Sequence, residues 1–310
     1  MSASLLVPCY NAATFLPRLW ETVRAQSLPF DEMICYDDCS TDATAAVAQS
    51  LGATVIRGQP NVGPALARNR LWQAARTPWV HFHDPDDLLR PDFLTRMSAR
   101  ATDAVDAVIC DADWQHENER RTFLRWRYSE SALLADPAAY LLEHPVGGIN
   151  GLYRRAALEQ IGGFNARLLV WEDADLHVRL ALAGARFAVV AEPLVIALRR
   201  NDSLSAPLAR NWRNRLSALE DYARLSAPPS FARALGAEAE RAASAFALLR
   251  EPADAALAVD LCRRLGVHPP TSPHLAIRLL KPFVPAVTLL RWHSAWRAWF
   301  AARAGTTETS

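Results

Sequence analysis

Cysteine is scarce in this sequence, and the few cysteines do not form the pattern of a structural site. The 310 residues contain five cysteines and no Cys-x-x-Cys pair. Disulfide frameworks and zinc cages need paired cysteines at regular spacing, so we expect neither. Unpaired thiols favour a reducing compartment, and we therefore expect a cytoplasmic protein.

A surplus of one charge is also missing. The 34 Lys and Arg residues balance the 33 Asp and Glu residues, which leaves a net charge of +1. This balance argues against a basic surface over the whole protein, so no nucleic-acid partner is expected. The strand-like run at residues 5–7 comes almost at once, before any basic and apolar leader pattern, so we expect no secretory signal.

The sequence also lacks a glycine-rich loop of the kind that binds phosphate. No Gly-x-Gly-x-x-Gly motif follows the first apolar run, which disfavours a dinucleotide dehydrogenase. A nucleotidyltransferase is disfavoured too, because residues 7–15 form no glycine-rich, basic loop.

The first hundred residues alternate short apolar runs with helical patterns. Strands are expected at 4–10, 32–38, 53–57 and 79–84, and helices at 13–25, 42–51 and 63–76. Strands separated by helices pair in parallel, so this order predicts an α/β fold with a mostly parallel, nucleotide-binding type of sheet flanked by helices. Ligands of such sheets bind beyond the carboxyl ends of the strands.

The remaining pattern is less regular. We expect a strand at 107–110, an irregular stretch at 113–130, a helix near 131–143, a helix at 173–184 and a last strand at 186–200. After about residue 205 the sequence changes to Ala, Arg and Leu at helical spacing, broken by prolines. Two parts are therefore predicted: 1–205, which carries the polar clusters, and 206–310, a helical C-terminal region.

Acidic residues gather directly after the predicted strand at 79–84. Asp84, Asp86 and Asp87 lie in a turn with Pro85. Carboxylates this close repel one another, and a divalent cation held by one or two of them plus substrate phosphates would relieve the repulsion. Turn formation or helix capping is the alternative, with about equal weight.

Three further clusters of polar residues lie where a predicted helix begins, and each has a functional and a structural interpretation. The acids of the segment 37–42 lie where a strand ends and a helix begins, and a carboxylate there can bind a base or ribose, although capping explains one acid. The segment 61–69 places Arg68 in the first turns of a helix, which suits a diphosphate, unless Arg68 is a solvated surface residue. Glu172, Asp173 and Asp175 precede an amphipathic helix, and one of them facing a cleft is a candidate general base.

In their order and spacing these clusters resemble glycosyltransferase family 2, the large inverting family with the GT-A fold, in its bacterial form. The resemblance covers residues 4 to about 205. It rests on six motifs, VPCYNAATFL at 7–16, DDCSTD at 37–42, NVGPALARN at 61–69, HDPDD at 83–87, GGFN at 162–165 and WED at 171–173.

The resemblance implies roles for residues around the nucleotide. Pro8, Tyr10 and Asp38 match positions that hold the base, with Asp38 accepting a hydrogen bond from the base edge. Asn11 and Asp37, their neighbours at the strand ends, are predicted to belong to the same nucleotide site.

It implies roles at the reacting groups as well. Arg68 matches a base or phosphate contact. Asp84 and Asp86 match the DxD motif, in which Asp86 binds Mn²⁺ or Mg²⁺ and Asp84 holds ribose or the metal. Asp173 matches the catalytic base, and Glu172 is the second candidate.

The sequence departs from the family pattern after the last strand. A histidine near the diphosphate is usual there, and this sequence offers Asn201. Asparagine binds metal less well than imidazole, so metal affinity is expected to depend on Asp86. His81 and His83 alternate with Phe82, and a core or supporting role is expected for both.

The implied reaction transfers a sugar from a nucleoside-diphosphate sugar to the hydroxyl of a saccharide or lipid-linked acceptor. UDP is the expected nucleotide of the donor. Synthesis of a bacterial surface polysaccharide or glycoconjugate is the expected context. The alternative from another class is a catalytically silent GT-A module that binds a nucleotide sugar without turning it over.

The segment 274–305 combines tryptophans with basic residues and contains no acid. It lacks the roughly 20 consecutive apolar residues of a transmembrane helix. A helix in the membrane interface, at the inner face of the cell membrane, is one interpretation. Packing on the catalytic part or in a homo-oligomer is the other.

Overall fold

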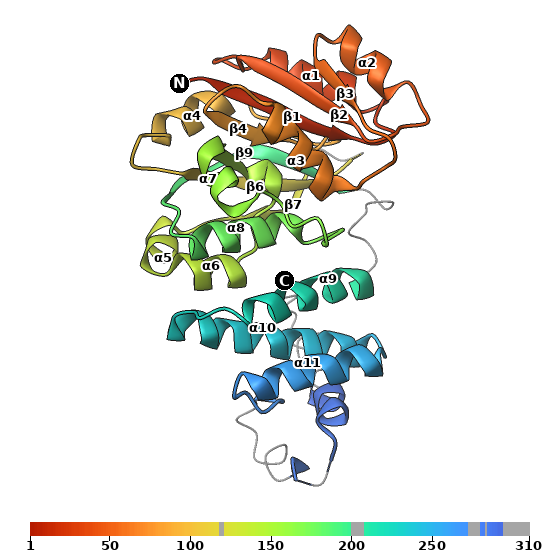
Figure 1. The fold of residues 1–310 in the computed structure, drawn as a ribbon, viewed down its shortest axis with the longest axis vertical. Helices are drawn as coiled ribbons and strands as arrows, with labels where there is room; N and C mark the ends of the chain where they lie inside the picture. Colours follow the sequence, from red (N-terminus) through yellow and green to blue (C-terminus); the bar gives the residue numbers. More distant parts are fainter. Residues whose placement is uncertain (118–120, 200–207, 272–279, 283, 294–310) are drawn as a thin grey trace. The chain divides into compact units, whose positions relative to one another are not determined.

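The computed structural model describes all of the chain except residues 118–120, 200–207, 272–279, 283 and 294–310. The chain divides into two compact units, Met1–Ser203 and Leu204–Ser310. Unit 1 contains a sheet with helices around it, and unit 2 is helical in its described part (Figure 1).

Unit 1 is built on one sheet whose strands lie in the order β3-β2-β1-β4-β8-β6-β9-β5, with β7 paired to β6. The strands are β1 (Ala3–Cys9), β2 (Glu32–Asp37), β3 (Thr54–Arg57), β4 (Trp79–Phe82), β5 (Leu88–Leu89), β6 (Ala107–His116), β7 (Thr122–Trp126), β8 (Gly151–Arg154) and β9 (Phe187–Arg199). The first four strands form parallel pairs, and β6 is parallel to β9. The predicted α/β fold with a mostly parallel sheet is confirmed.

Strand β8 is antiparallel to both of its neighbours, β4 and β6. The sequence pattern predicts no strand in this region. The preceding turn is η1 (Gly148–Asn150), and the chain then enters the sheet because Leu152 and Tyr153 bury apolar side chains there. This reversed strand joins the parallel first half of the sheet to the second half.

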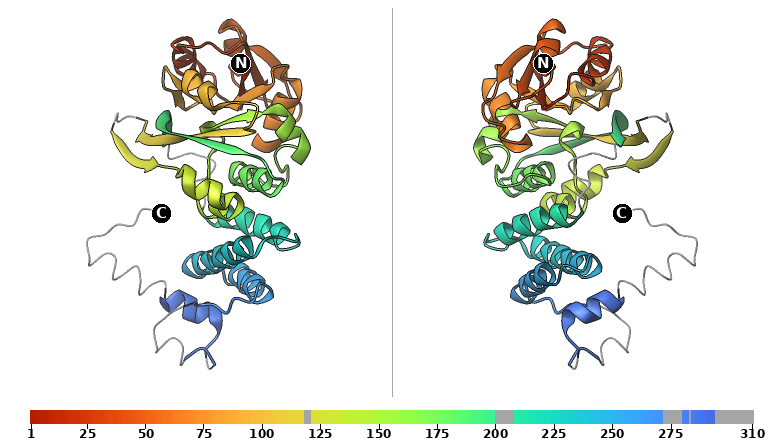
Figure 2. Two further views of the ribbon diagram at one scale, coloured as in Figure 1. Left: turned by 90° about the vertical axis from the view of Figure 1, so that its left-hand side faces the viewer. Right: turned by 90° about the vertical axis from the view of Figure 1, so that its right-hand side faces the viewer.

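The stretch expected to be irregular, 113–130, contains most of a hairpin made by β6 and β7 (Figure 2). The two faces of the hairpin explain why the sequence pattern predicted an irregular stretch. On one face Asp113 lies opposite Arg125, and on the other the rings of Trp114 and Trp126 pack edge to face with centroids 5.0 Å apart. Alternating charged and aromatic residues therefore form a two-faced strand pair.

The helices of unit 1 are α1 (Leu16–Arg24), α2 (Thr44–Ser50), α3 (Pro64–Ala74), α4 (Phe93–Arg100), α5 (Glu130–Ala135), α6 (Pro137–Glu143), α7 (Arg155–Ile161) and α8 (Glu172–Leu182). The single helix expected near 131–143 is interrupted at Asp136. The Asp136 carboxylate accepts a hydrogen bond from the Ala139 N–H at 3.2 Å, and Pro137 begins a new helix.

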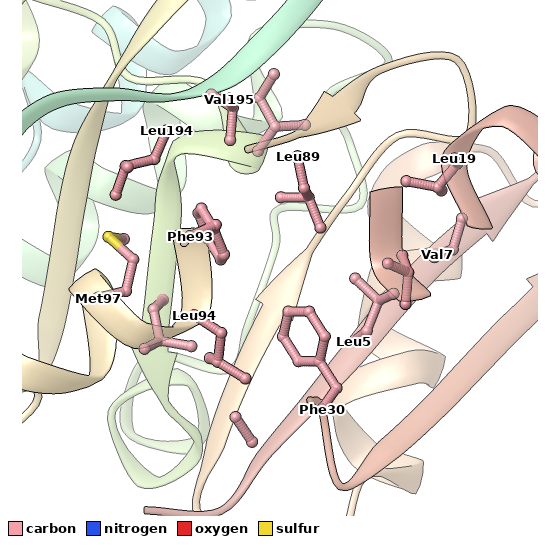
Figure 3. Close-up of a cluster of buried hydrophobic side chains, with 14 of the residues drawn as sticks. Leu5, Val7, Leu19, Phe30, Leu89, Phe93, Leu94, Met97, Leu194 and Val195 are labelled. Carbon is pink, nitrogen blue, oxygen red and sulfur yellow. The ribbon is translucent and has the colours of Figure 1, made fainter. Parts of the chain in front are cut away.

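A buried apolar cluster holds one face of the sheet (Figure 3). Leu5 and Val7 of β1 contribute to it, together with Phe93 and Met97 of α4 and Val195 of β9. Because these residues come from both halves of the sheet, the cluster fixes the strand ends that carry the polar motifs.

Unit 2 contains α9 (Leu208–Tyr222), α10 (Pro229–Leu248) and α11 (Pro252–Arg264). Helix α10 packs against both others, and its buried face includes Ala239, Ala242 and Ala243. Within the described ranges of the chain, no helix has the length and apolar character needed to cross a membrane.

Asn69 fastens the GGFN segment to helix α3. Its Oδ1 accepts hydrogen bonds from the Phe164 N–H at 2.8 Å and from the Trp72 indole N–H at 3.0 Å. Its Nδ2 donates to the Phe164 carbonyl at 2.8 Å. Gly163 has φ +71°, and a Cβ there would lie 2.2 Å from Asn69 Oδ1, so only glycine fits.

Asn69→Ala should lower the free energy of unfolding by roughly 2–4 kcal/mol, because it leaves buried polar groups of Phe164 and Trp72 unpaired. Urea denaturation followed by circular dichroism measures the change. Gln49→Ala, on the exposed face of α2, is the control and should stay within about 0.5 kcal/mol of the wild type. Equal stability of the two variants would contradict the assigned role of Asn69.

Candidate active site

The polar motifs meet at the carboxyl ends of β1, β2 and β4. These strands are parallel neighbours, so the residues that follow them lie at one edge of the sheet. Two main-chain bonds hold the strand ends together: the Asp38 N–H donates to the Cys9 carbonyl at 2.8 Å, and the His83 N–H donates to the Leu6 carbonyl at 3.0 Å.

Asn11 links the loops that follow β1 and β2. It adopts a left-handed backbone conformation, with φ +50°. Its N–H donates to Ser40 Oγ at 2.9 Å, and its Oδ1 accepts from the Thr41 N–H at 2.9 Å. The amide oxygen thus shapes the loops, whereas the neighbouring Tyr10 is 54% exposed and free of the core. Pro8, in β1, is half-buried.

Asp38 holds the loop that precedes α3. Its two carboxylate oxygens accept hydrogen bonds from the N–H groups of Val62 and Gly63, both at 2.8 Å. Asp37 is used similarly, since its Oδ1 accepts from the Ser40 N–H at 3.1 Å. Each carboxylate oxygen has a second lone pair, so these bonds do not prevent Asp38 from also accepting from a ligand.

Arg68 gathers the acids of two distant motifs. Its side chain is only 4% exposed, which rules out the solvated alternative. Nη2 lies 2.7 Å from Asp84 Oδ1, and Nη1 lies 2.6 Å from Glu172 Oε1 and 3.6 Å from Asp173 Oδ1. The guanidinium also lies over the Phe164 ring, 5.6 Å from its centroid. The acid turn after β4 and the start of α8 therefore share one cation.

Burial and crowding set the pKa values of these acids. Burial, reinforced by Asp173, raises the pKa of Glu172 to about 7 although Arg68 opposes the shift. Burial also raises the pKa of Asp173, and Arg68 counteracts it while Asp84 adds to it. Burial disfavours the charge on Arg68, but Asp173, Asp84 and Glu172 together raise its pKa. One arginine faces three carboxyl groups, so the site favours a further cation.

Asp87 differs from its two neighbours in the acid turn. It is 7% exposed, and its Oδ1 accepts a hydrogen bond from the Leu198 N–H of β9 at 2.7 Å. Burial and the charges of Asp86 and Asp84 raise its pKa. Asp87 thus anchors the turn, and Asp84 and Asp86 remain half-buried at the mouth of the site.

The donor set of Asp84 and Asp86 fits a hard divalent cation. No group of three metal-ligating side chains occurs in the part of the chain that the structure describes. Mg²⁺ and Mn²⁺ are commonly held by one or two carboxylates together with substrate phosphates, so two acids suffice. Asn201, the residue in place of the usual histidine, lies outside the described residues.

His81 and His83 belong to the core. Both are fully buried, with His81 Nε2 3.1 Å from His83 Nδ1 and His81 Nδ1 2.8 Å from the Gly151 carbonyl. Burial lowers the pKa of both rings, that of His83 to about 3. Their rings pack in the core and support β4, and we assign them no role as metal ligands beside Asp84 and Asp86.

The surroundings of Asp173 include residues that the sequence patterns did not single out. A Cβ on Gly148 would lie 2.8 Å from Asp173 Oδ1, so this glycine makes room for the carboxylate. His177 Nδ1 lies 2.6 Å from the Asp173 carbonyl, and Tyr153 Oη lies 2.8 Å from His177 Nε2. The four-residue spacing of Asp173 and His177 was a visible signal, whereas nothing in the sequence marked Tyr153.

Comparison with known families shows which family the chain belongs to. Residues 4–162 match the family described as Glycosyl transferase family 2. The chain belongs to glycosyl transferase family 2. The matched region contains Arg68, Asp84 and Asp86 and ends before Glu172 and Asp173. The predicted family is confirmed.

Two bacterial proteins illustrate what this family 2 chain is similar to. It is 31% identical to the succinoglycan biosynthesis protein ExoO of Rhizobium meliloti over 66% of the chain and 63% of the relative. It is 32% identical to the putative glycosyltransferase EpsH of Bacillus subtilis over 51% of the chain and 48% of the relative. The match thus spans less than two thirds of the length of either relative.

Solved structures share the fold. TarS 1-349 of S. aureus in complex with UDP-GlcNAc superimposes with a TM-score of 0.71 at 20% identity, covering 99% of this chain and 93% of TarS 1-349. The mannosyltransferase PcManGT of Pyrobaculum calidifontis, in complex with GDP-Man and Mn²⁺, gives 0.62 at 21% identity, covering 98% and 83%. At this identity the likeness establishes the GT-A fold alone.

Glu172→Gln should change how the stability of this transferase-family chain depends on pH. The pKa of Glu172 is about 7 in the folded chain, against 4.5 as its ordinary value. The folded state therefore keeps a proton that the unfolded state loses, and this stabilisation disappears as the pH rises from 4.5 through 7. The loss amounts to at most about 1.4 kcal/mol per pH unit for one group.

Glutamine does not titrate, so the variant should show a flatter decline in that window. Urea denaturation at a series of pH values measures both curves. Glu159→Gln, on the exposed surface of α7, is the control and should follow the wild type. Parallel curves for wild type and Glu172→Gln would refute the raised pKa of Glu172.

Proposed function

We propose that this chain is an inverting glycosyltransferase that moves a sugar from a nucleoside-diphosphate sugar to an acceptor hydroxyl. The observation that carries the proposal is the buried Arg68, which joins Asp84 of the DxD motif to Glu172 and Asp173 of α8. A phosphate-binding cation and a proton-accepting acid then lie side by side, as a displacement at an anomeric carbon requires.

Asp173 is the proposed catalytic base. Its Oδ1 is buried beside Arg68, at 3.6 Å from Nη1, but the side chain as a whole is 23% exposed, so an acceptor hydroxyl can reach the carboxylate. Its raised pKa brings the carboxylate closer to neutrality as a proton acceptor. Glu172 is less suited, because its Oε1 is engaged by Arg68 at 2.6 Å. A single displacement assisted by one base inverts the anomeric configuration.

Arg68 is proposed to contact the diphosphate. Its Nε makes no hydrogen bond, and the charge of the guanidinium is retained because three acids face it. Asp86, with Asp84, is proposed to hold Mn²⁺ or Mg²⁺, which when bound would neutralise charge on the leaving diphosphate. Pro8, Tyr10, Asn11, Asp37 and Asp38 line the edge proposed for the nucleoside.

UDP is the proposed nucleotide, supported by the complex of the structural neighbour TarS with UDP-GlcNAc. A saccharide or lipid-linked acceptor in bacterial surface polysaccharide synthesis is proposed because relatives carry names such as succinoglycan biosynthesis protein. We propose that 1–205 is the catalytic domain and that 206–310 serves contact with a membrane or another copy of the chain.

The proposed peripheral contact at the inner face of the membrane concerns 274–305, much of which lies outside the described residues. Within the part that is described, Leu280 is 40% exposed and Trp292 55% exposed, with Lys281 and Arg291 nearby in sequence. Exposed apolar and basic side chains together suit an anionic lipid surface. A catalytically silent nucleotide-sugar module remains the rival, and turnover separates the two.

Binding of UDP should require a divalent cation and Asp86. Calorimetric titration of UDP, GDP and dTDP with and without Mn²⁺ measures this. We expect one nucleotide to bind with Mn²⁺ and to lose at least about ten-fold in affinity in Asp86→Ala, because the cation loses a carboxylate ligand. Asp103→Ala removes a fully exposed acid and should bind like the wild type. Absence of binding to all three nucleotides would sink the assignment of the site.

Asp173→Asn should abolish turnover without abolishing nucleotide binding. Loss of a general base costs about 10² to 10⁴ in kcat. Glu172→Gln should cost less than about ten-fold, because it removes only one partner of Arg68. Release of nucleotide from UDP-glucose, UDP-GlcNAc and GDP-mannose, with water as acceptor, provides the rates. The reverse order of effects would move the base to Glu172, and no turnover by the wild type would favour the silent module.

A further inference from the structure

The first turn of α8 carries Asp173 but has weak support of its own. Trp171, the residue before the helix, has φ +74° and provides no side-chain cap to the helix N–H groups. The N-terminal N–H groups of a helix lack partners within the helix, and an uncapped first turn frays easily. A carboxylate that must act at a fixed place therefore needs support from elsewhere.

His177 supplies that support from one turn further along the helix. It is fully buried, and its Nδ1 lies 2.6 Å from the Asp173 carbonyl. A carbonyl oxygen only accepts, so Nδ1 carries the proton and Nε2 is left as an acceptor. Burial lowers the pKa of His177 to about 4, which keeps the ring neutral in this tautomer at neutral pH.

Tyr153 fixes the other side of the ring. This residue of β8 is fully buried, and its Oη lies 2.8 Å from His177 Nε2. Since Nε2 has no proton, the phenol donates its single proton to Nε2 at 2.8 Å, and the Gly148 carbonyl, 3.4 Å from Oη, is the more distant acceptor. The direction of both bonds is thus determined: Tyr153 donates to His177, and His177 donates to the main chain of Asp173.

The segment that contains Tyr153 also touches the carboxylate. A Cβ on Gly148 would lie 2.8 Å from Asp173 Oδ1, and a Cβ on Gly151 would lie 1.9 Å from Tyr153 Oη. Glycine at both positions lets the carboxylate and the phenol approach the backbone of 148–151. The ring of Tyr153 packs beside Phe82, 5.9 Å between centroids, and Phe82 ends the strand that leads to Asp84.

We infer that Tyr153 and His177 are positioning residues for Asp173, which tie the first turn of α8 to β8 and so hold the carboxylate in place beside Arg68 and Asp84. The inference rests on the proposed function of Asp173 as a base. The pair touches no reacting atom and acts through Asp173. Displacement of a reacting group by about 1 Å can cost about 10² in rate, so the tie has a measurable effect.

Three variants test the tie. Tyr153→Phe removes the donor to Nε2 and keeps the ring. His177→Asn keeps a short amide that can donate to the Asp173 carbonyl but no longer reaches Tyr153. The double variant combines both. Tyr140→Phe is the matched control, because Tyr140 is a buried tyrosine of the same unit that accepts from the Ser129 N–H at 2.8 Å and stacks on His144.

We expect each single variant to lower kcat for nucleotide release from UDP-glucose, UDP-GlcNAc or GDP-mannose by roughly 10- to 100-fold. The donor KM and the nucleotide affinity should stay within about three-fold of the wild type, since the tie does not touch the nucleotide. The double variant should be no more than about three-fold slower than the slower single variant, because both changes remove the same tie. Tyr140→Phe should keep kcat within about two-fold.

A spectroscopic measurement tests the geometry without turnover. In ¹⁵N-labelled wild type the His177 imidazole should be a neutral Nδ1–H tautomer at pH 7, and Tyr153→Phe should shift its Nε2 resonance. An Nε2–H tautomer would overturn the inference even if a variant fails to fold. So would a folded Tyr153→Phe with wild-type kcat, or an equal loss in Tyr140→Phe. If the wild type releases no nucleotide from any donor, the proposed function fails instead.

Discussion

A buried guanidinium among carboxyl groups organises this protein. Arg68 is almost fully buried, and a charge in that position is tolerated only because Asp84 and Glu172 pair with it at hydrogen-bond distance. The pairing also acts in the other direction, because the acids could not crowd together without the cation. The sheet edge, the acid turn and the start of α8 consequently form one electrostatic unit, in which a change to any member alters the protonation of the others.

Much of this arrangement could be predicted from the sequence. The alternation of apolar runs with helical patterns indicated parallel strands, and parallel strands bring Asp38 and Asp84 to one edge. The resemblance to the family then singled out Arg68 and Asp173. Patterns of this kind report which face of an element is apolar and where an element ends, and both properties are local.

The rest depended on long-range contacts that no local pattern reports. Strand β8 was missed because its four residues are too few to show a periodic pattern, and its partners β4 and β6 are distant in sequence. The hairpin of β6 and β7 was missed because its charged residues pair across the two strands. In the sequence, the mixture of charged and aromatic residues therefore indicated an irregular stretch. Asn11 and Asp38 were expected to face a nucleotide, and the contacts seen in the structure are those that shape the neighbouring loops.

The two halves of the sheet are joined at two places, and the first is the reversed strand β8. Three residue pairs, Trp79 with Arg154, Val80 with Tyr153 and His81 with Leu152, connect it to the first half. The second half, from β6 onward, forms its own strand pairs. Strand β5 joins the two halves a second time, because Leu88 and Leu89 pair with Ile196 and Val195 of β9 at the far edge of the sheet. An insertion or deletion that shifts β9 would therefore also displace the acid turn that precedes β5, so neither half of the sheet can change length independently of the other.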